Sequence, residues 1–401
     1  NVAKRYSKFS AAQKHEYNIF LTHMASRTAM ESFFHSLLTR PRAAVIVSLK
    51  CELRPKDKLT TKARLVCLPP LGVSTALGVL FAHFSQHVSK FPVSPYAVGF
   101  SYAHGGAQLL HDWVLGRSFG SFEFFAYGDD TYIVLTLGNG DVFVMAMDVS
   151  HMDLSVSMKS AQRVSLMMAN MHAECKSDQI WINVCTFLAY LWIKSPRVTF
   201  QNLVTEKKDG IGFMSGFPGT TQLNTLISID ILNGVKASVG EFEPSSVASL
   251  VNAHWRRRGF TPKEGTLTWE CVRRCGVVPS VWHSQFLKCG IREEGGTWVP
   301  HKNSPSLRES LLASFFFNVQ YHADAKVSLM ASALGALGRV ITHYPDKDVY
   351  LLALSLWNYV VNKYSIIHFD INEFEGTEHP KVLAFLEGIF RRDEEGVRVG
   401  R

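Results

Sequence analysis

The sequence has no long hydrophobic run. None of its apolar stretches reaches the roughly eighteen residues that a membrane-spanning helix needs, and the N-terminus lacks the apolar segment of a signal peptide. Cysteine is scarce as well. The seven cysteines are an odd number spread over 401 residues, which excludes a disulfide-bonded scaffold and favours a reducing compartment. Hydrophobic residues make up 47% of the chain, enough for a packed core, so a mainly disordered protein is also excluded.

Positive charge is missing from one segment of a mildly basic chain. The formal net charge is +8, and residues 1–70 supply the whole excess, with 13 Lys and Arg against 4 Asp and Glu. Residues 118–158, in contrast, hold six acidic residues and no Lys or Arg. The basic end predicts an anionic partner, with nucleic acid first. The acidic segment predicts a bound divalent cation, because carboxylates gathered without a counter-charge repel one another.

The cysteines do not predict a zinc site. Cys271, Cys275, His283 and Cys289 form a sparse set, and their spacing does not follow the regular zinc-binding patterns. Buried thiols are the simpler interpretation.

The strongest strand pattern lies in the acidic segment. Strand-like runs flank the tetrapeptide YGDD at residues 127–130, and an Asn-Gly pair at 139–140 predicts a tight hairpin before a third strand that ends at Asp148. Three consecutive antiparallel strands would return Asp148 to the sheet edge that carries Asp129 and Asp130. Carboxylates suit Mg²⁺ or Mn²⁺, and a cluster of this kind can hold two ions. The alternative is a plain polar turn, since Gly and Asp are common turn residues.

Three segments resemble the central motifs of viral RNA-dependent RNA polymerases. The YGDD hairpin is similar to motif C. Asp148 and Asp153, separated by four residues, resemble motif A. The third segment resembles motif B and contains Ser215, Gly216, Thr220 and Asn224, the last two on an expected helix near 218–238. An ordinary helix-entry loop is the alternative for the Ser-Gly pair.

Three further segments carry weaker resemblances. The basic stretch 50–64 resembles motif F, which would line a nucleotide entry channel, although a solvated charged loop is the alternative. Its candidate contacts with nucleotide are Lys50, Arg54, Lys56, Lys58 and Arg64. Lys263, at the end of the sequence GFTPK, resembles the end of motif D, and an exposed turn lysine is the alternative. Phe286, Leu287 and Lys288 resemble the primer-grip motif E.

The order of the motifs is permuted, because motif C precedes motif A. This order is similar to that of the permutotetravirus (Thosea asigna virus-like) polymerases and, more distantly, the birnavirus polymerases. Birnavirus members have Asn as the second residue of the Asp pair, whereas this chain has Asp130. The permutation is physically simple: in such a palm the motif A strand lies beside the second strand of the motif C hairpin, so a short turn joins them.

The resemblance implies a role for each acidic residue. Asp148 and Asp129 would hold two divalent ions, with Asp130 contributing or positioning. Asp153 would recognise the ribose 2′-hydroxyl together with Ser215 and Asn224. An alternative for Asp153 is the N-cap of a helix beginning near Leu154.

The resemblance implies roles for the remaining residues too. Lys263 would act as a general acid that protonates the leaving pyrophosphate. Gly216 and Thr220 would contact the substrate, as would the basic residues of motif F. Phe286, Leu287 and Lys288 would support the primer.

The expected fold is a right-hand polymerase of the α+β class. Its antiparallel palm sheet would be of the split β-α-β type with permuted connectivity. Fingers are expected at residues 1–118 and 156–214, the palm at 119–155 and 215–289, and a helical thumb at 290–401. Permuted viral polymerases carry longer N-terminal regions, so this chain is expected to lack some of their elements.

The expected function is template-directed RNA synthesis from NTPs, with release of pyrophosphate, in the replication of a viral RNA genome. The expected partners are RNA template and product, NTPs and a protein primer, for which Tyr6, Ser7 and Ser10 are candidate acceptors. The expected location is the host cytoplasm or the virion. The alternatives are a reverse transcriptase, a template-independent nucleotidyltransferase and a silent RNA-binding scaffold. Reverse transcriptases place a bulky aromatic residue at the position of Asp153, which argues against that alternative.

Overall fold

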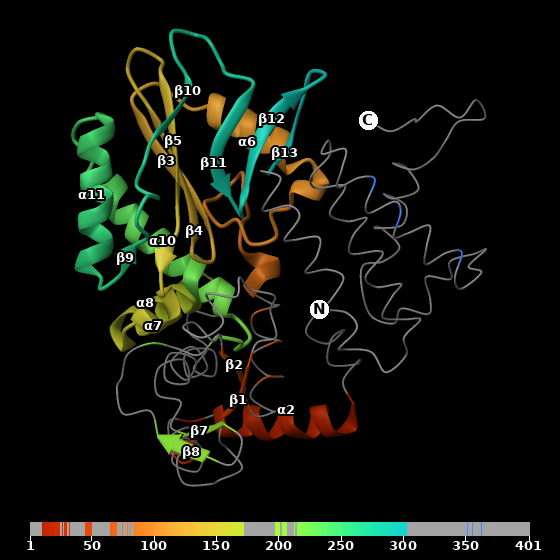
Figure 1. Ribbon diagram of the computed structural model, residues 1–401. Helices are drawn as coiled ribbons and strands as arrows, with labels where there is room; N and C mark the ends of the chain where they lie inside the picture. The colour runs from red at the N-terminus through yellow and green to blue at the C-terminus, as the bar shows by residue number, and fades with distance from the viewer. Residues whose placement is uncertain are drawn as a thin grey trace. The chain divides into compact units, whose positions relative to one another are not determined.

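The computed structural model in Figure 1 describes residues 10–24, 45–49, 65–69, 84–171, 197–200, 203–206 and 215–302, with isolated positions outside these ranges. Nearly all of them belong to a compact unit made of residues 1–50 and 54–298. The helices are α2 (Ala11–Met24), η2 (Tyr102–His104), α6 (Gly106–Leu115), α7 (Met152–Ser155), α8 (Met158–Met171), α10 (Thr220–Lys236) and α11 (Pro244–Arg257). The strands are β1 (Val45–Leu49), β2 (Leu65–Leu68), β3 (Ser121–Tyr127), β4 (Asp130–Thr136), β5 (Val142–Met147), β6 (Val149–Ser150), β7 (Arg197–Phe200), β8 (Leu203–Glu206), β9 (Thr261–Pro262), β10 (Glu270–Arg273), β11 (Val281–Phe286), β12 (Cys289–Glu294) and β13 (Thr297–His301).

A four-stranded antiparallel sheet forms the centre of this unit, with the strand order β10-β5-β4-β3. The predicted series of three consecutive antiparallel strands is confirmed. The second hairpin lies where the Asn-Gly pair predicts it, but its loop has three residues instead of two. The amide of Leu137 donates to the carbonyl of Asp141 at 2.9 Å, and Gly140 adopts a φ of 87°. This is the three-residue loop in which a turn is followed by a left-handed glycine.

Both faces of the sheet are buried, and alternate residues of each strand belong to different cores. One core packs β3–β5 against α8, α10 and α11, and it includes Phe124, Ile133 and Met145. The other lies between the sheet and α6 and β11–β13, and it includes Phe125 and Val134. Figure 1 shows the two sets of elements on opposite sides of the sheet.

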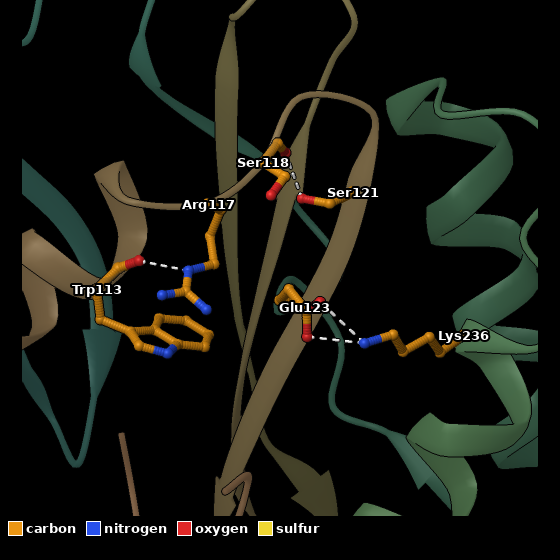
Figure 2. A network of polar contacts seen from close by, with 6 residues as sticks. All are labelled: Trp113, Arg117, Ser118, Ser121, Glu123 and Lys236. Carbon is orange, nitrogen blue, oxygen red and sulfur yellow. Dashed lines mark hydrogen bonds and ion pairs between the residues drawn. The ribbon is translucent and has the colours of Figure 1, made fainter. Parts of the chain in front are cut away.

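Helix α10 is fixed to β3 at the far end of the sheet. In Figure 2 the side chains of Glu123 and Lys236 face each other, and each carboxylate oxygen lies 2.9 Å from Nζ. On the other side of the same strand, Arg117 donates from Nε to the carbonyl of Trp113 at 2.8 Å, and its guanidinium lies over that indole. The helix therefore runs along β3 with its last turn tied to the strand.

Smaller sheets surround this centre. They have the orders β2-β1-β7-β8 and β11-β12-β13, and a short pair, β6 and β9, extends from the end of β5. Within the described residues, no helix is long and apolar enough to cross a membrane. Nearly all of the expected thumb and the entire motif F stretch lie outside the described residues.

Candidate active site

The β3–β4 turn presents Asp129 at the end of the central sheet. Tyr127 and Asp130 are paired, so Gly128 and Asp129 alone form the turn. Gly128 has a φ of 66° and Asp129 does not have a positive φ, which is the pattern of a type II′ turn with glycine first. Gly128 is buried, Asp129 is exposed and Asp130 is partly buried. The tight turn thus fixes two adjacent carboxylates at one edge of the sheet.

Asp148 follows directly on β5 and lies at the same edge. Thr131 pairs with Met147, and the register continued by one position places Asp148 beside Asp130. Burial raises the pKa of Asp130 to about 7, and the neighbouring carboxylates of Asp129 and Asp148 add to the rise. The three carboxylates therefore lie close enough to repel one another, as the hairpin pattern predicts.

Lys263, the residue that follows β9, contacts the same carboxylate cluster. Its Nζ lies 2.7 Å from Oδ2 of Asp148, and its backbone amide donates to the Asp148 carbonyl at 2.8 Å. The hydrogen bond to Asp148 raises the pKa of Lys263 and keeps the ammonium charged. Thr266 supports this loop through a 2.7 Å hydrogen bond from its hydroxyl to the Lys263 carbonyl. A side chain and a main-chain contact together hold Lys263 against Asp148.

Lys288 approaches Asp130 on a second two-residue turn. Phe286 pairs with Cys289, so Leu287 and Lys288 form the turn between β11 and β12. Lys288 lies close enough to Asp130 to lower the pKa of that carboxyl, as does Lys263. The hydroxyl of Tyr102 lies 3.0 Å from the Phe286 carbonyl and 3.2 Å from that of Cys289, at the base of the turn.

Asp153 and Asn224 are brought together although 71 residues separate them. Asn224 Nδ2 donates to Oδ1 of Asp153 at 3.1 Å. The alternative interpretation of Asp153 as an N-cap is wrong, because α7 begins at Met152 and its N-cap is His151, with a left-handed φ of 50°. Asn224 is 4% exposed, and within the described part of the chain its Oδ1 has no hydrogen-bond partner.

The Ser215-Gly216 loop precedes α10 and contacts β2. The Ser215 carbonyl accepts from the amide of Cys67 at 2.8 Å, and Gly216 has a φ of 102°. A Cβ on Gly216 would lie 2.8 Å from the Cys67 carbonyl oxygen, so the close approach needs glycine. The Thr220 hydroxyl donates to the Phe217 carbonyl at 2.8 Å, within the turn that leads into α10. The loop is thereby joined to the strand that follows the basic stretch.

The comparisons with known proteins agree with this geometry. The sequence model of the permutotetravirus RNA-dependent RNA polymerase palm domain matches residues 37–287, which is more than half of the chain. The chain belongs to this family. The resemblance inferred from the motifs is confirmed, and so is the α+β right-hand polymerase fold.

Solved structures of birnavirus polymerases have the same fold as this chain. The RNA polymerase VP1 from Infectious Pancreatic Necrosis Virus is 12% identical, with a TM-score of 0.63, and the match covers 93% of this chain and 54% of that one. The birnavirus VP1 in the X-ray structure of the VP1–VP3 complex is 13% identical, with a TM-score of 0.63 and coverages of 94% and 52%. The chain thus spans about half the length of these proteins. No curated protein sequence matches it.

The carboxylates fit a divalent cation by the chemistry of their donors. They are hard oxygen ligands whose mutual repulsion raises the pKa of Asp130, and an ion would offset this repulsion. Within the described residues, no group of three His, Cys, Asp or Glu side chains is arranged to hold a metal. The ammonium of Lys263 lies on the Oδ2 side of Asp148.

Sequence reasoning missed three residues at this palm site. They are Tyr102 at the base of the Lys288 turn, and the hydroxyl residues Thr225 and Ser228 of α10, which contact Gly128. The two hydroxyl residues lie three positions apart on a mostly apolar helix, one and four residues after Asn224, and that spacing was the available signal. The predicted nucleotide contacts Lys50, Arg54, Lys56, Lys58 and Arg64 lie outside the described residues, as do Tyr6 and Ser7.

Proposed function

We propose that this chain carries the catalytic palm of an RNA-dependent RNA polymerase. The observation that carries the proposal is the meeting of Asp129, Asp130 and Asp148 at one sheet edge in a chain of this family. In the proposed reaction a 3′-hydroxyl attacks the α-phosphate of an NTP, and pyrophosphate leaves. Two divalent ions, Mg²⁺ or Mn²⁺, would activate the hydroxyl and offset the charge of the leaving group.

The residues of the chain divide this work. Asp129 and Asp148 would hold the ions, with Asp130 as a third oxygen donor or a positioning group. The ammonium of Lys263, kept protonated by its hydrogen bond to Asp148, would donate a proton to pyrophosphate. Its hydrogen bond to Asp148 makes it a weaker acid, and a loosening of that contact would favour proton transfer to pyrophosphate.

The Asp153–Asn224 pair would select ribose. The unpartnered Oδ1 of Asn224 is a buried acceptor that a substrate hydroxyl can satisfy. A deoxynucleotide would leave this acceptor unpaired, which disfavours its incorporation. We therefore propose NTPs as substrates, with RNA as template and product, and we place the reaction in the infected host cell or the virion. A protein primer remains a further proposed partner.

Primer extension with RNA template tests the proposal. The 401-residue chain is assayed with NTPs or dNTPs and with Mg²⁺ or Mn²⁺, alongside Asp129→Asn and Asp148→Asn. Each substitution should reduce extension by at least about 10³-fold while RNA binding remains, because it removes a ligand charge at the reacting centre. Asp141→Asn is the matched control, since it makes the same charge change at the opposite end of the sheet.

The outcomes separate the alternatives. Extension with NTPs that is lost in both site variants supports the polymerase. Efficient extension with dNTPs would indicate a reverse transcriptase, and extension without template would indicate a template-independent nucleotidyltransferase. RNA binding with no synthesis under any condition would indicate a silent scaffold.

A further inference from the structure

The backbone amide and the backbone carbonyl of the buried Gly128 each contact a hydroxyl of α10. Its amide donates to Oγ1 of Thr225 at 2.7 Å, and its carbonyl oxygen lies 3.2 Å from Oγ of Ser228. Both hydroxyl residues are 0% exposed. One face of α10 therefore contacts both the backbone N–H and the backbone carbonyl of this turn residue.

The turn cannot satisfy this amide by itself. In the two-residue hairpin, Tyr127 and Asp130 form the last ladder pair, so the amide of the first turn residue has no partner strand. A buried N–H group without an acceptor is costly. Thr225 resolves this, since its hydroxyl donates to the Thr221 carbonyl at 2.7 Å and leaves its oxygen free to accept from Gly128.

The Ser228 contact is the weaker of the two. Its single hydrogen is shared between the Gly128 carbonyl at 3.2 Å and the Asn224 carbonyl of its own helix at 2.9 Å. The shorter distance favours the helix carbonyl. Thr225 is therefore expected to dominate the grip on the turn.

We propose that Thr225 is a positioning residue for nucleotidyl transfer, which acts by fixing the Gly128 peptide and thereby the direction of the Asp129 carboxylate. The inference rests on the role proposed above for Asp129. Asn224 precedes Thr225 and donates to Asp153, so adjacent residues of one helical turn hold both carboxylate-bearing segments. The helix sets the distance between the proposed ribose site and the proposed ion site.

Thr225→Val tests the hydroxyl without changing the shape of the side chain. We expect kcat for NTP incorporation to fall roughly 10- to 100-fold, because a misplaced ligand weakens stabilisation of the transition state. KM for NTP should stay within about twofold, since the ribose contacts are unchanged. Thr225→Ser restores the hydroxyl and should recover most of kcat. Ser228→Ala should reduce kcat by only about threefold, in line with its longer contact.

Two controls separate positioning from general damage to the helix. Ser165→Ala removes a buried hydroxyl of α8 that bonds only its own helix, the Ala161 carbonyl at 2.9 Å, so it should leave kcat unchanged. Lys236→Gln breaks the α10–β3 contact at the far end of the sheet and should also leave kcat unchanged.

Hydrogen exchange provides a readout that does not depend on activity. In Thr225→Val the Gly128 amide should exchange faster, while the rest of β3 keeps its protection. Wild-type kcat in a folded Thr225→Val protein overturns the inference, and so does a loss that Thr225→Ser fails to restore. If Thr225→Val melts below the assay temperature, Thr225→Ala takes its place, and wild-type kcat with unchanged exchange of the Gly128 amide in that variant would overturn the inference. Failure of the proposed function looks different: the wild-type chain and Asp129→Asn would then be equally inactive.

Discussion

Two hairpin turns meet at the proposed catalytic edge, and each carries a different kind of cost. In the β3–β4 turn the positive φ falls on Gly128, so the backbone is relaxed, but the adjacent carboxylates repel and the pKa of Asp130 rises to about 7. In the β11–β12 turn Leu287 and Lys288 have φ values of 50° and 64°, in a turn that normally has Asn and Gly. The acidic β3–β4 turn is therefore destabilised by charge repulsion, and the basic β11–β12 turn by backbone strain.

The two turns present opposite charges to the same edge of the sheet. The acidic turn offers oxygen ligands, while the basic turn offers an ammonium near the same carboxylates. Strained backbone that surrounding contacts maintain is typical of functional sites. Here Tyr102 maintains the basic turn and Thr225 the acidic one, each through a hydroxyl bonded to the main chain. The two turns are thus destabilised for different reasons, but each is held by a side-chain hydroxyl bonded to its main chain.

The largest effect is expected for a substitution that removes the charge repulsion in the acidic turn. Asp130→Asn should stabilise the metal-free protein at pH 8, by an upper limit of about 4 kcal/mol for a shift from 3.8 to about 7. The folded pKa is above the unfolded value, so the folded state keeps a proton that the unfolded state loses. The stability of the wild-type chain relative to the variant therefore falls as pH rises from about 4 to 7, and levels off above that. Urea unfolding in EDTA at pH 5, 6 and 8 measures this difference.

A difference between Asp130→Asn and wild type that is constant across this pH range would contradict the prediction. Saturating Mg²⁺ serves as the internal control. If the carboxylates hold the ion as proposed, its binding should restore the stability of the wild-type chain at pH 8 and leave the variant less affected.

The next effect reverses the charge of the basic turn. Lys288→Glu would add a fourth negative charge near Asp130, and primer extension should fall roughly 10- to 100-fold through weaker binding of the primer–template. Titration of labelled RNA duplex at two salt concentrations measures the affinity and its salt dependence. Arg256→Glu, an exposed change on α11, is the matched control. Equal losses in both variants would mean that overall charge matters and the position of Lys288 does not.

Two substitutions with smaller effects, opposite in sign, test the backbone strain in the two turns. Lys288→Gly should raise the free energy of unfolding by up to about 1 kcal/mol, because it relieves a left-handed non-glycine residue. Gly128→Ala should lower it by about 1–2 kcal/mol for the same reason in reverse. Chemical denaturation measures both. Lys288→Ala also removes the ammonium but keeps the strain, so it should not be stabilised, and stabilisation equal to that of Lys288→Gly would contradict the strain.

The same two turns mark how far the sequence predicts the site. The Gly-Asp-Asp turn and the return of Asp148 follow from local turn chemistry and strand period, which act over a few residues and are legible in one chain. The Leu-Lys turn has no turn residues, and only the family resemblance placed its basic tip. The contacts of Thr225 and Tyr102 join segments about 100 and 180 residues apart, and tertiary packing alone decides them. Local chemistry therefore predicts the ligands but not the groups that hold them.

The smallest effect removes the support of the basic turn. Tyr102→Phe deletes the hydroxyl shared by the Phe286 and Cys289 carbonyls and should cost about 1 kcal/mol of unfolding free energy. Affinity for primer–template should fall roughly two- to fivefold, because the turn that presents Lys288 is less restrained. Fluorescence anisotropy with a labelled RNA duplex measures it. In a Lys288→Gly background the same substitution should no longer change this affinity, since the ammonium is gone. A loss of stability with no change of affinity in either background would make Tyr102 a structural support only.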